Sequence, residues 1–157
     1  MAFNIQGLNS PDKQNNILDF ISLNKIDISV LTECKISNLA LQKLKKEALM
    51  KNLKVLGNRH GFSQVLLILT LKAANHLTAV NMHENAMHIR LSKIGLKFDL
   101  VGVYVPVGGD DHPSISDFIM SIKKASYDDN SALLITGDMN ATLSLEDRIL
   151  YRDDGNF

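Results

Sequence analysis

Residues 3–33 read FNIQGLNSPDKQNNILDFISLNKIDISVLTE, and their pattern predicts a strand, a helix and a second strand. The short apolar run at the start is followed by Gly7, which is typical of a strand end and turn. Residues 10–12, SPD, are typical of a helix start, because Ser can cap, Pro suits the first helical position and an acid suits the first turn. Residues 26–32, IDISVLT, are β-branched and mostly apolar, as in a buried strand, so Glu33 follows directly at its end.

A second helix is expected beyond this segment. Ser37 or Asn38 can cap its first turn, since both side chains can accept a hydrogen bond from an unpaired backbone N–H. Its apolar residues Leu41, Leu44 and Ala48 recur at helical spacing.

The middle of the chain changes to short strand-like runs, separated by Asn, Glu or Gly. Their close spacing predicts an antiparallel meander over residues 64–72, 76–82, 86–92 and 96–106. A loop at 107–117, a helix to about Tyr127 and a buried strand at 133–136 follow. The mixture of an α/β start with an antiparallel meander predicts an α+β sandwich better than a uniformly parallel sheet.

The bulk composition is that of one folded domain. With 157 residues, the chain can bury one sizeable core and is short for two. Its residues are 45% hydrophobic and 22% charged, which argues against global disorder. The single cysteine, Cys34, excludes an internal disulfide framework and fits a reducing compartment.

Hydropathy and the distribution of charge further narrow the classes of protein to which the chain can belong. No apolar run is long enough to cross a membrane, and the N-terminus lacks a charged start followed by an apolar segment, so we expect no membrane partner, no secretory signal and an intracellular protein. The formal charge is zero, but Lys and Arg dominate the first sixty residues and Asp and Glu the last part. The basic half could bind phosphates, and the acidic end could bind a divalent cation. Two solvated faces of different charge would give the same distribution.

Polar residues stand at or just beyond several expected strand ends. They are Asn4, Glu33, Tyr104 and the pair Asp138 and Asn140. Strand ends at one edge of a sheet are where a rigid scaffold can hold reactive groups. Glu33 is the strongest functional candidate among them, because an isolated carboxylate is costly to bury without a partner or a metal.

The stretch LLITGDMN, residues 133–140, has two interpretations. Gly137 interrupts the apolar run, and Asp138 and Asn140 lie two residues apart, so in an extended segment both side chains would point to the same side. An Asp and an Asn on one face could hold a water and a phosphate oxygen. The same two residues are also the usual ones in an Asx-type turn. Taken alone, the stretch fits either.

Other catalytic patterns are not met. The sequence contains no Walker or dinucleotide-binding glycine motif and no G-x-S-x-G elbow. Cys34 has no evident activating base, so we expect it to be a packing residue. The histidines show neither a helical H-x-x-x-H pair nor a cysteine partner for zinc; they are His60, His76, His83, His88 and His112.

The order of these features resembles the endonuclease/exonuclease/phosphatase superfamily, which has the deoxyribonuclease I-like fold. That family begins with a strand ending in Asn, a helix, and a strand that delivers a metal-binding Glu in a pattern like LQET, for which residues 31–34 have LTEC. GVYVP, residues 102–106, resembles the family's strand ending in Tyr and Pro, and ITGDMN, residues 135–140, resembles its GDFN box. The segments NIQGLNSP and GDMNATLSLEDR are most similar to those of apurinic-type endonuclease domains of non-LTR (LINE-type) retrotransposons.

The resemblance implies a four-layer α/β/β/α sandwich and a role for each residue. Glu33 would bind Mg²⁺ or Mn²⁺, with Asn4 beside it on the metal side or at the phosphate. Asp138 would orient or deprotonate the attacking water, while Asn140 and Tyr104 would contact the scissile phosphate. Such a site hydrolyses a phosphodiester, and in DNA the 3′-hydroxyl left behind could prime a reverse transcriptase.

The sequence also departs from the family pattern. The family's domains, at roughly 200–250 residues, are completed by further strands and a terminal Ser-Asp-His motif, which nothing after Arg148 supplies. His112 lies in a loop before the GDMN box and is wrongly placed to substitute. We therefore expect residues 1–157 to be a single truncated domain, with the second sheet partly missing and the catalytic set incomplete.

The leading functional hypothesis is a metal-dependent phosphodiester hydrolase, a DNA endonuclease of retroelement origin, in which activity depends on whether the missing Asp and His are dispensable. A retroelement origin would be compatible with a nuclear location. One alternative is a non-catalytic remnant or binding module. Another is a phosphatase acting on a small or lipid phosphoester, because a near-neutral chain lacks the strong basic patch typical of a duplex-binding surface.

Overall fold

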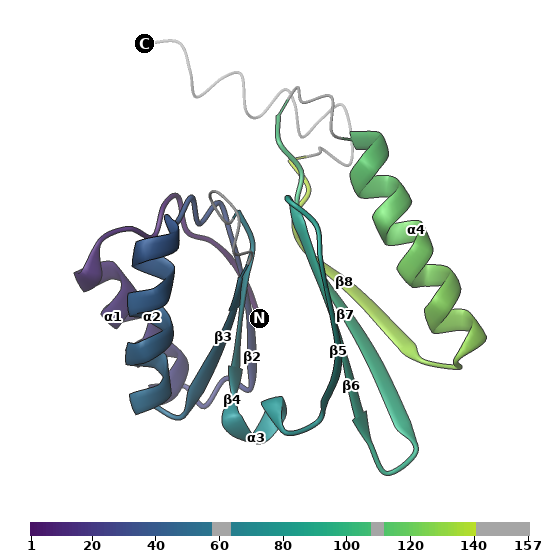
Figure 1. The fold of residues 1–157 in the computed structure, drawn as a ribbon, viewed down its shortest axis with the longest axis horizontal. Helices are drawn as coiled ribbons and strands as arrows, with labels where there is room; N and C mark the ends of the chain where they lie inside the picture. The colour runs from purple at the N-terminus through teal and green to yellow at the C-terminus, as the bar shows by residue number, and fades with distance from the viewer. Residues whose placement is uncertain (58–63, 108–111, 141–157) are drawn as a thin grey trace.

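The computed structural model describes residues 1–57, 64–107 and 112–140. They form four layers: two helices, a first sheet, a second sheet and one further helix (Figure 1). The first sheet has the strand order β1 (Ala2–Asn4), β2 (Ile28–Thr32), β4 (Leu66–Thr70) and β3 (Leu53–Gly57). The second has the order β5 (Leu77–Met82), β6 (Ala86–Lys93), β7 (Leu96–Tyr104) and β8 (Ala132–Asp138). The helices are α1 (Pro11–Leu23), α2 (Asn38–Met50), the short α3 (Leu71–Ala74) and α4 (His112–Asp128).

Each sheet contains one parallel pair. β1 runs parallel to β2 and β7 runs parallel to β8, whereas the other neighbouring strands are antiparallel. The register sets Asn4 opposite Thr32 and Tyr104 opposite Asp138. Because parallel strands end at the same edge of a sheet, the C-terminal residues of each pair are brought together.

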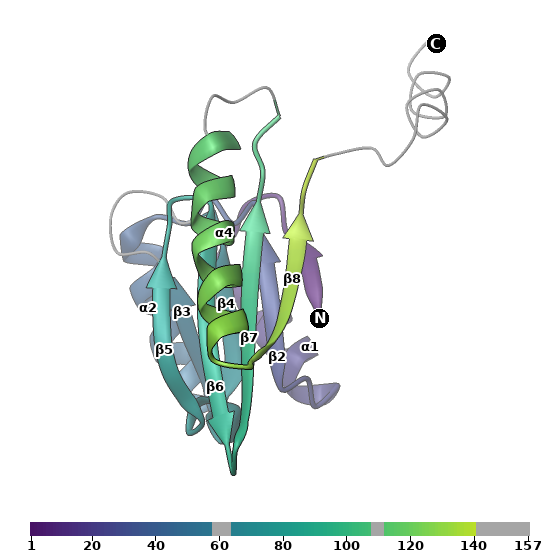
Figure 2. The same cartoon turned by 90° about the vertical axis from the view of Figure 1, so that its right-hand side faces the viewer.

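Three apolar cores separate the layers. α1 and α2 cover the outer face of the first sheet, the two sheets pack face to face, and α4 lies along the outer face of the second sheet (Figures 1 and 2). The sequence of β4 does not alternate between apolar and polar residues, because Leu66 and Ile68 face the helices while Leu67 and Leu69 face the second sheet. A strand covered on both faces must be apolar throughout.

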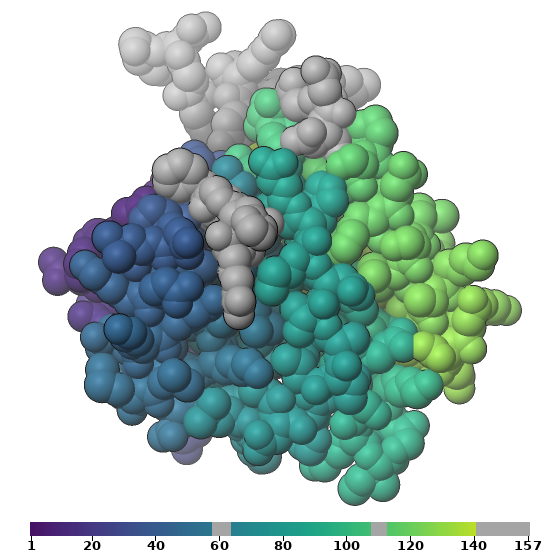
Figure 3. Space-filling model, in the orientation of Figure 1, coloured from purple at the N-terminus to yellow at the C-terminus, as the bar shows by residue number. Residues whose placement is uncertain are grey.

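In the space-filling view the two halves of the molecule lie side by side (Figure 3).

The helix starts mostly agree with the sequence predictions. α1 begins at Pro11 after Ser10, although the Ser10 side chain makes no capping hydrogen bond. α2 is capped by Ser37, whose Oγ accepts a hydrogen bond from the backbone N of Ala40. The predicted loop at 107–117 is wrong in its second part, because α4 begins at His112. None of the helices in the described segments is long and apolar enough to cross a membrane.

The strand predictions need three corrections. The expected four-strand meander is wrong, since only β5 to β7 form one and β4 pairs with β2 and β3 in the other sheet. β3 was not predicted at all. β8 does not end at Gly137 but continues through Asp138, and it is not buried: it is the edge strand of its sheet within the described residues, with Leu134 49% exposed.

Candidate active site where the two sheets meet

The candidate residues lie at one end of the sandwich. Asn4 ends β1, Glu33 follows β2, Tyr104 ends β7 and Asp138 ends β8. Figure 2 shows the arrowheads of β7 and β8 pointing to the same end of the molecule. Two parallel pairs, one from each sheet, therefore deliver four polar side chains to one edge of the molecule.

Asn4 and Asp138 connect the two sheets. The Nδ2 of Asn4 donates a hydrogen bond to Oδ2 of Asp138 over 2.7 Å, between residues 134 positions apart. The Oδ1 of Asn4 accepts a hydrogen bond from the backbone N of Gln6 at 3.1 Å. Both ends of the Asn4 amide are thus engaged, so its orientation and that of the Asp138 carboxylate are set together.

Tyr104 and Glu33 make a second connection between the sheets. The Tyr104 hydroxyl donates a hydrogen bond to Oε1 of Glu33 at 3.0 Å. Burial raises the pKa of Tyr104, and the hydrogen bond and negative charge of Glu33, with the charge of Asp138, raise it further. Tyr104 therefore stays a neutral hydrogen-bond donor at neutral pH.

The backbone around Glu33 holds an unusual conformation. Glu33 has φ of 51°, in the left-handed region that non-glycine residues seldom adopt. The backbone N of Gly7 donates to the Glu33 carbonyl and that of Leu8 to the Cys34 carbonyl, both at 2.7 Å. The segment after β1 therefore stabilises the turn that presents Glu33, a pattern found where strain serves a site.

Cys34 points away from this chemistry. Its side chain is fully buried in the core beneath α1 and α2. Burial raises the pKa of the Cys34 thiol to about 12, so it remains protonated and is a poor nucleophile. The prediction that it is a packing residue is confirmed.

Asp138 and Asn140 form a turn and also belong to the site. The backbone N of Asn140 donates to Oδ1 of Asp138 at 3.0 Å, which is an Asx-type contact, and Asn140 has φ of 44°. The chain is therefore not extended here, and the expectation that both side chains share one side of a strand does not apply. The Asn140 Nδ2 donates instead to the carbonyl of Val105 at 2.7 Å, which ties the end of β8 to the end of β7.

The ligands available for a metal are few. In the segments that the structure describes, no group of three or more His, Cys, Asp and Glu side chains could hold a metal ion. Mg²⁺, however, usually keeps several waters and binds through only one or two carboxylates. Glu33, which follows β2, supplies one such carboxylate.

No protein-family model and no curated protein sequence matches the chain. Solved structures do match. TDP2 of D. rerio complexed with a single-strand DNA product superposes with a TM-score of 0.65 at 16% identity, over 90% of this chain and 60% of that one.

Two further structures match the same fold. The endonuclease domain of TRAS1, a telomere-specific non-LTR retrotransposon, gives a TM-score of 0.58 at 13% identity, covering 90% of this chain and 58% of that chain. An AP endonuclease from Archaeoglobus fulgidus gives 0.63 at 15% identity, covering 92% and 58%. All three are proteins of the endonuclease/exonuclease/phosphatase superfamily, and this chain has their deoxyribonuclease I-like fold. The chain spans about 60% of the length of these structures.

Proposed function

We propose that this chain, with its deoxyribonuclease I-like fold, is a divalent-metal-dependent phosphodiester hydrolase whose substrate is DNA. The observation that carries the proposal is the pair of hydrogen bonds between the sheets, Asn4 to Asp138 and Tyr104 to Glu33. Four polar residues that are far apart in the chain meet at one edge, in the order in which the superfamily's motifs occur. A solvated turn would not require partners from the opposite sheet.

Asp138 is the residue best suited to act on the attacking water. Its two carboxylate oxygens accept hydrogen bonds from Asn4 and from the backbone N of Asn140, which fixes the plane of the carboxylate. Each oxygen retains acceptor capacity, so the same carboxylate can receive a proton from water. Asn4 acts here as a positioning residue.

Tyr104 is suited to stabilise charge on the phosphate. Its raised pKa keeps the phenol protonated, and this neutral donor would stabilise a phosphate oxyanion without a proton transfer if its single hydrogen bond to Glu33 is exchanged for one to the phosphate. Asn140 would add an amide donor if its bond to the Val105 carbonyl is exchanged for one to the phosphate. Glu33 would hold Mg²⁺ or Mn²⁺, and the ion, when bound, would neutralise charge on the phosphate and the leaving oxygen.

DNA is proposed over other phosphoesters because of the fold neighbours. One TDP2 structure holds a single-strand DNA product, and TRAS1 is a retrotransposon endonuclease domain. Together with the segments NIQGLNSP and GDMNATLSLEDR, these neighbours favour a retroelement-derived endonuclease. The 3′-hydroxyl of its product would prime a reverse transcriptase.

Nicking of supercoiled plasmid in the presence of Mg²⁺ or Mn²⁺ tests the proposal. The chain should convert supercoiled to open-circular DNA, and Asp138→Asn should reduce the rate at least about a hundredfold. Asp117→Asn, on the exposed surface of α4, removes the same charge away from the site and should nick as the unchanged chain does. Equal nicking by all three proteins would identify a contaminant and reject the catalytic proposal.

A non-catalytic binding module is the second candidate. The hydrogen bonds of the site involve no histidine within the described residues, and both Asp138 oxygens and the Asn140 amide are already engaged. Calorimetric titration with Mn²⁺ and with a DNA duplex distinguishes the two: binding without nicking supports the module. Hydrolysis of a small phosphoester but not of plasmid would instead indicate a phosphatase.

A further inference from the structure

The turn between β6 and β7 exposes two aliphatic side chains at the end of the molecule opposite the candidate site. Its sequence is KIGLK, residues 93–97, and Ile94 is 93% exposed and Leu96 77% exposed. Both ribbon views show this turn extending beyond the rest of the sandwich (Figures 1 and 2). Neither residue belongs to any of the three cores.

The backbone conformation of Ile94 makes this exposure harder to explain by folding. Ile94 has φ of 47° and Gly95 has φ of 78°, so both central residues of the turn are left-handed. Asn and Gly are the residues that suit such a turn, while a β-branched residue there is an outlier. Neither packing nor local conformation favours isoleucine at this position. A contact outside the chain would.

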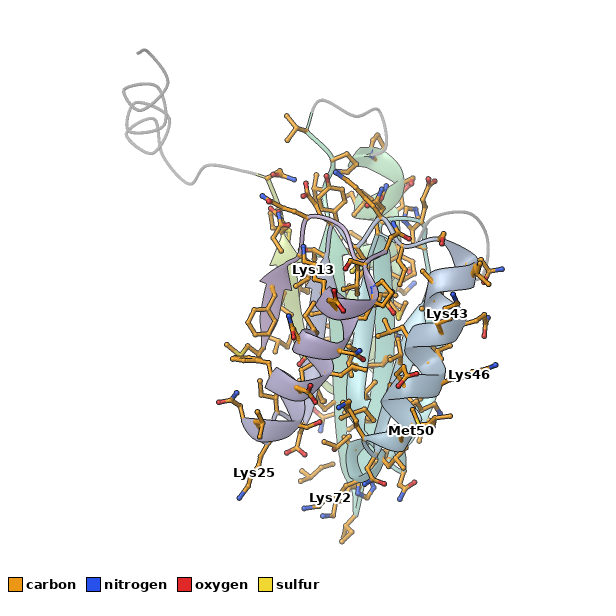
Figure 4. All side chains as sticks on the ribbon, turned by 90° about the vertical axis from the view of Figure 1, so that its left-hand side faces the viewer. Lys13, Lys25, Lys43, Lys46, Met50 and Lys72 are labelled. Atoms are coloured by element: carbon orange, nitrogen blue, oxygen red, sulfur yellow. The ribbon has the colours of Figure 1, made fainter. Side chains whose placement is uncertain are left out.

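Lysines surround the exposed tip. Lys93 precedes Ile94, and it lines a hollow of about 260 Å³ together with Lys72, His76 and an apolar wall that includes Leu96 and Phe98. A second hollow, of about 310 Å³, adjoins it, shares Lys72, and is also lined by Lys25 and Lys51. Figure 4 shows Lys25 and Lys72 together at this end of the molecule.

The local charge is positive after pairing is considered. Asp27 lines both hollows and accepts a hydrogen bond from the Thr70 hydroxyl. Lys51 pairs with Asp19, and Lys97 lies 3.5 Å from Asp129. With Lys51 paired to Asp19, three lysines, Lys25, Lys72 and Lys93, line the two hollows against the single carboxylate of Asp27. We call this end, with Ile94, Leu96, Lys25, Lys72 and Lys93, the basal surface.

We propose that the basal surface docks on an anionic lipid membrane, with Ile94 and Leu96 entering the boundary between headgroups and acyl chains and Lys25, Lys72 and Lys93 facing the lipid phosphates. Exposed aliphatic side chains flanked by lysines suit an anionic membrane surface. Burial of the aliphatic side chains and attraction of the lysines to lipid phosphates each add to the binding free energy. No arginine lines either hollow, and the two rings there, Phe98 and His76, are half-buried, whereas Ile94 and Leu96 are exposed, so nucleic acid is a poorer fit. Hydropathy predicted no membrane partner because it detects only spanning segments. Two exposed side chains on a turn are too few to give such a signal.

Vesicle flotation with the 157-residue chain tests the proposal. The chain should float with vesicles containing a third phosphatidylserine and not with pure phosphatidylcholine, and added salt should weaken the binding. Ile94→Asn should lower the partition coefficient by at least about tenfold, because it removes a buried aliphatic contact. Since Asn suits the left-handed backbone, the variant should unfold at the same or a higher temperature, so lost binding cannot reflect misfolding.

Matched variants keep the test decisive. Ile94→Leu retains the apolar contact and should float as the unchanged chain does. Leu39→Asn makes a similar change at a 70% exposed position of α2 outside the basal surface and should also leave flotation unchanged. No flotation with anionic vesicles, or equal flotation of Ile94→Asn, overturns the proposal. Binding of a DNA duplex that Lys72→Gln and Lys93→Gln weaken but Ile94→Asn does not would assign the surface to nucleic acid instead.

Discussion

Tyr104 and Glu33 stand 71 residues apart in the chain, yet the phenol of one donates a 3.0 Å hydrogen bond to the carboxylate of the other. The contact joins the end of a strand in the second sheet to the turn that follows a strand in the first. It depends on the packing of the two sheets and on the left-handed backbone of Glu33. Changes that disturb either should therefore appear at the site.

Replacing Tyr104 by Phe should slow plasmid nicking on the order of a hundredfold, because one donor to the phosphate is lost. The loss in folding free energy should be only about 1 kcal/mol, since Glu33 is half-buried and water can replace the phenol. Single-turnover nicking and urea unfolding measure the two effects. A variant that unfolds at much lower urea would mean that the tyrosine acts mainly through the fold.

The pH dependence of stability should report the same tyrosine. Its pKa is raised above the ordinary value of 10.0 by burial and then by Glu33. The folded state therefore keeps the proton that the unfolded state releases, so the contribution to stability is present below pH 10 and is lost as the pH rises further. Urea unfolding of the unchanged chain and of Tyr104→Phe from pH 8 to 11 should show a difference that shrinks with pH. A constant difference would contradict this.

Glu33→Gln should abolish Mn²⁺ binding while leaving the fold intact. The glutamine oxygen can still accept the Tyr104 hydrogen bond, but the negative charge that a hard cation needs is gone. Calorimetric titration should show binding for the unchanged chain and none for the variant, with similar unfolding temperatures. Undiminished binding by Glu33→Gln would exclude Glu33 as the ligand.

Asp99 should be the most costly carboxylate to remove. It is fully buried on β7 and accepts hydrogen bonds from Arg90 at 2.8 and 2.9 Å and from Ser126 at 2.7 Å, and His88 Nε2 lies 2.7 Å from its Oδ1. Burial alone would raise its pKa, but these hydrogen bonds hold the pKa well below its usual range.

Asp99→Asn should therefore lower the free energy of unfolding by about 3 kcal/mol, because it leaves Arg90 without its buried partner. The unchanged chain should lose this stability as the pH falls below the ordinary carboxyl pKa of 3.8, and the variant should show a flatter acid limb. Asp129→Asn, at an exposed partner of the same arginine, should cost much less. Equal losses in the two variants would show that burial of Asp99 contributes little.

Gly137 should not tolerate a side chain. Its φ is 145°, and a Cβ there would lie 1.9 Å from the carbonyl oxygen of Val103. Gly137→Ala should cost at least about 2 kcal/mol and slow nicking, because β8 must move and Asp138 moves with it. Gly95→Ala, also at positive φ but with no atom within 4 Å, should cost only about 1 kcal/mol and leave nicking unchanged. Similar losses for both would assign the effect to the backbone angle alone.

Local patterns predicted much of the fold because they depend on neighbours in the chain. Helical periodicity located α1 and α2, and the apolar run at 64–72 located β4 as a strand. β3 escaped detection because LKVLG, residues 53–57, is short and follows α2 directly. The assignment of β4 to the wrong sheet has a similar cause, since strand spacing predicts neighbours in the chain and not the partner across a crossover.

The sequence by itself determined that Asn4, Glu33, Tyr104 and Asp138 would stand at or just beyond strand ends, because β-strand patterns and turn residues are local properties. Only the tertiary structure decided that Asn4 meets Asp138 across 134 residues, since that contact exists only when the two sheets pack face to face. The tertiary structure also resolved the two interpretations of GDMN: the turn is real, and the packing makes the same turn part of a site. Contacts between distant residues follow from the packing of whole layers, which no local pattern encodes.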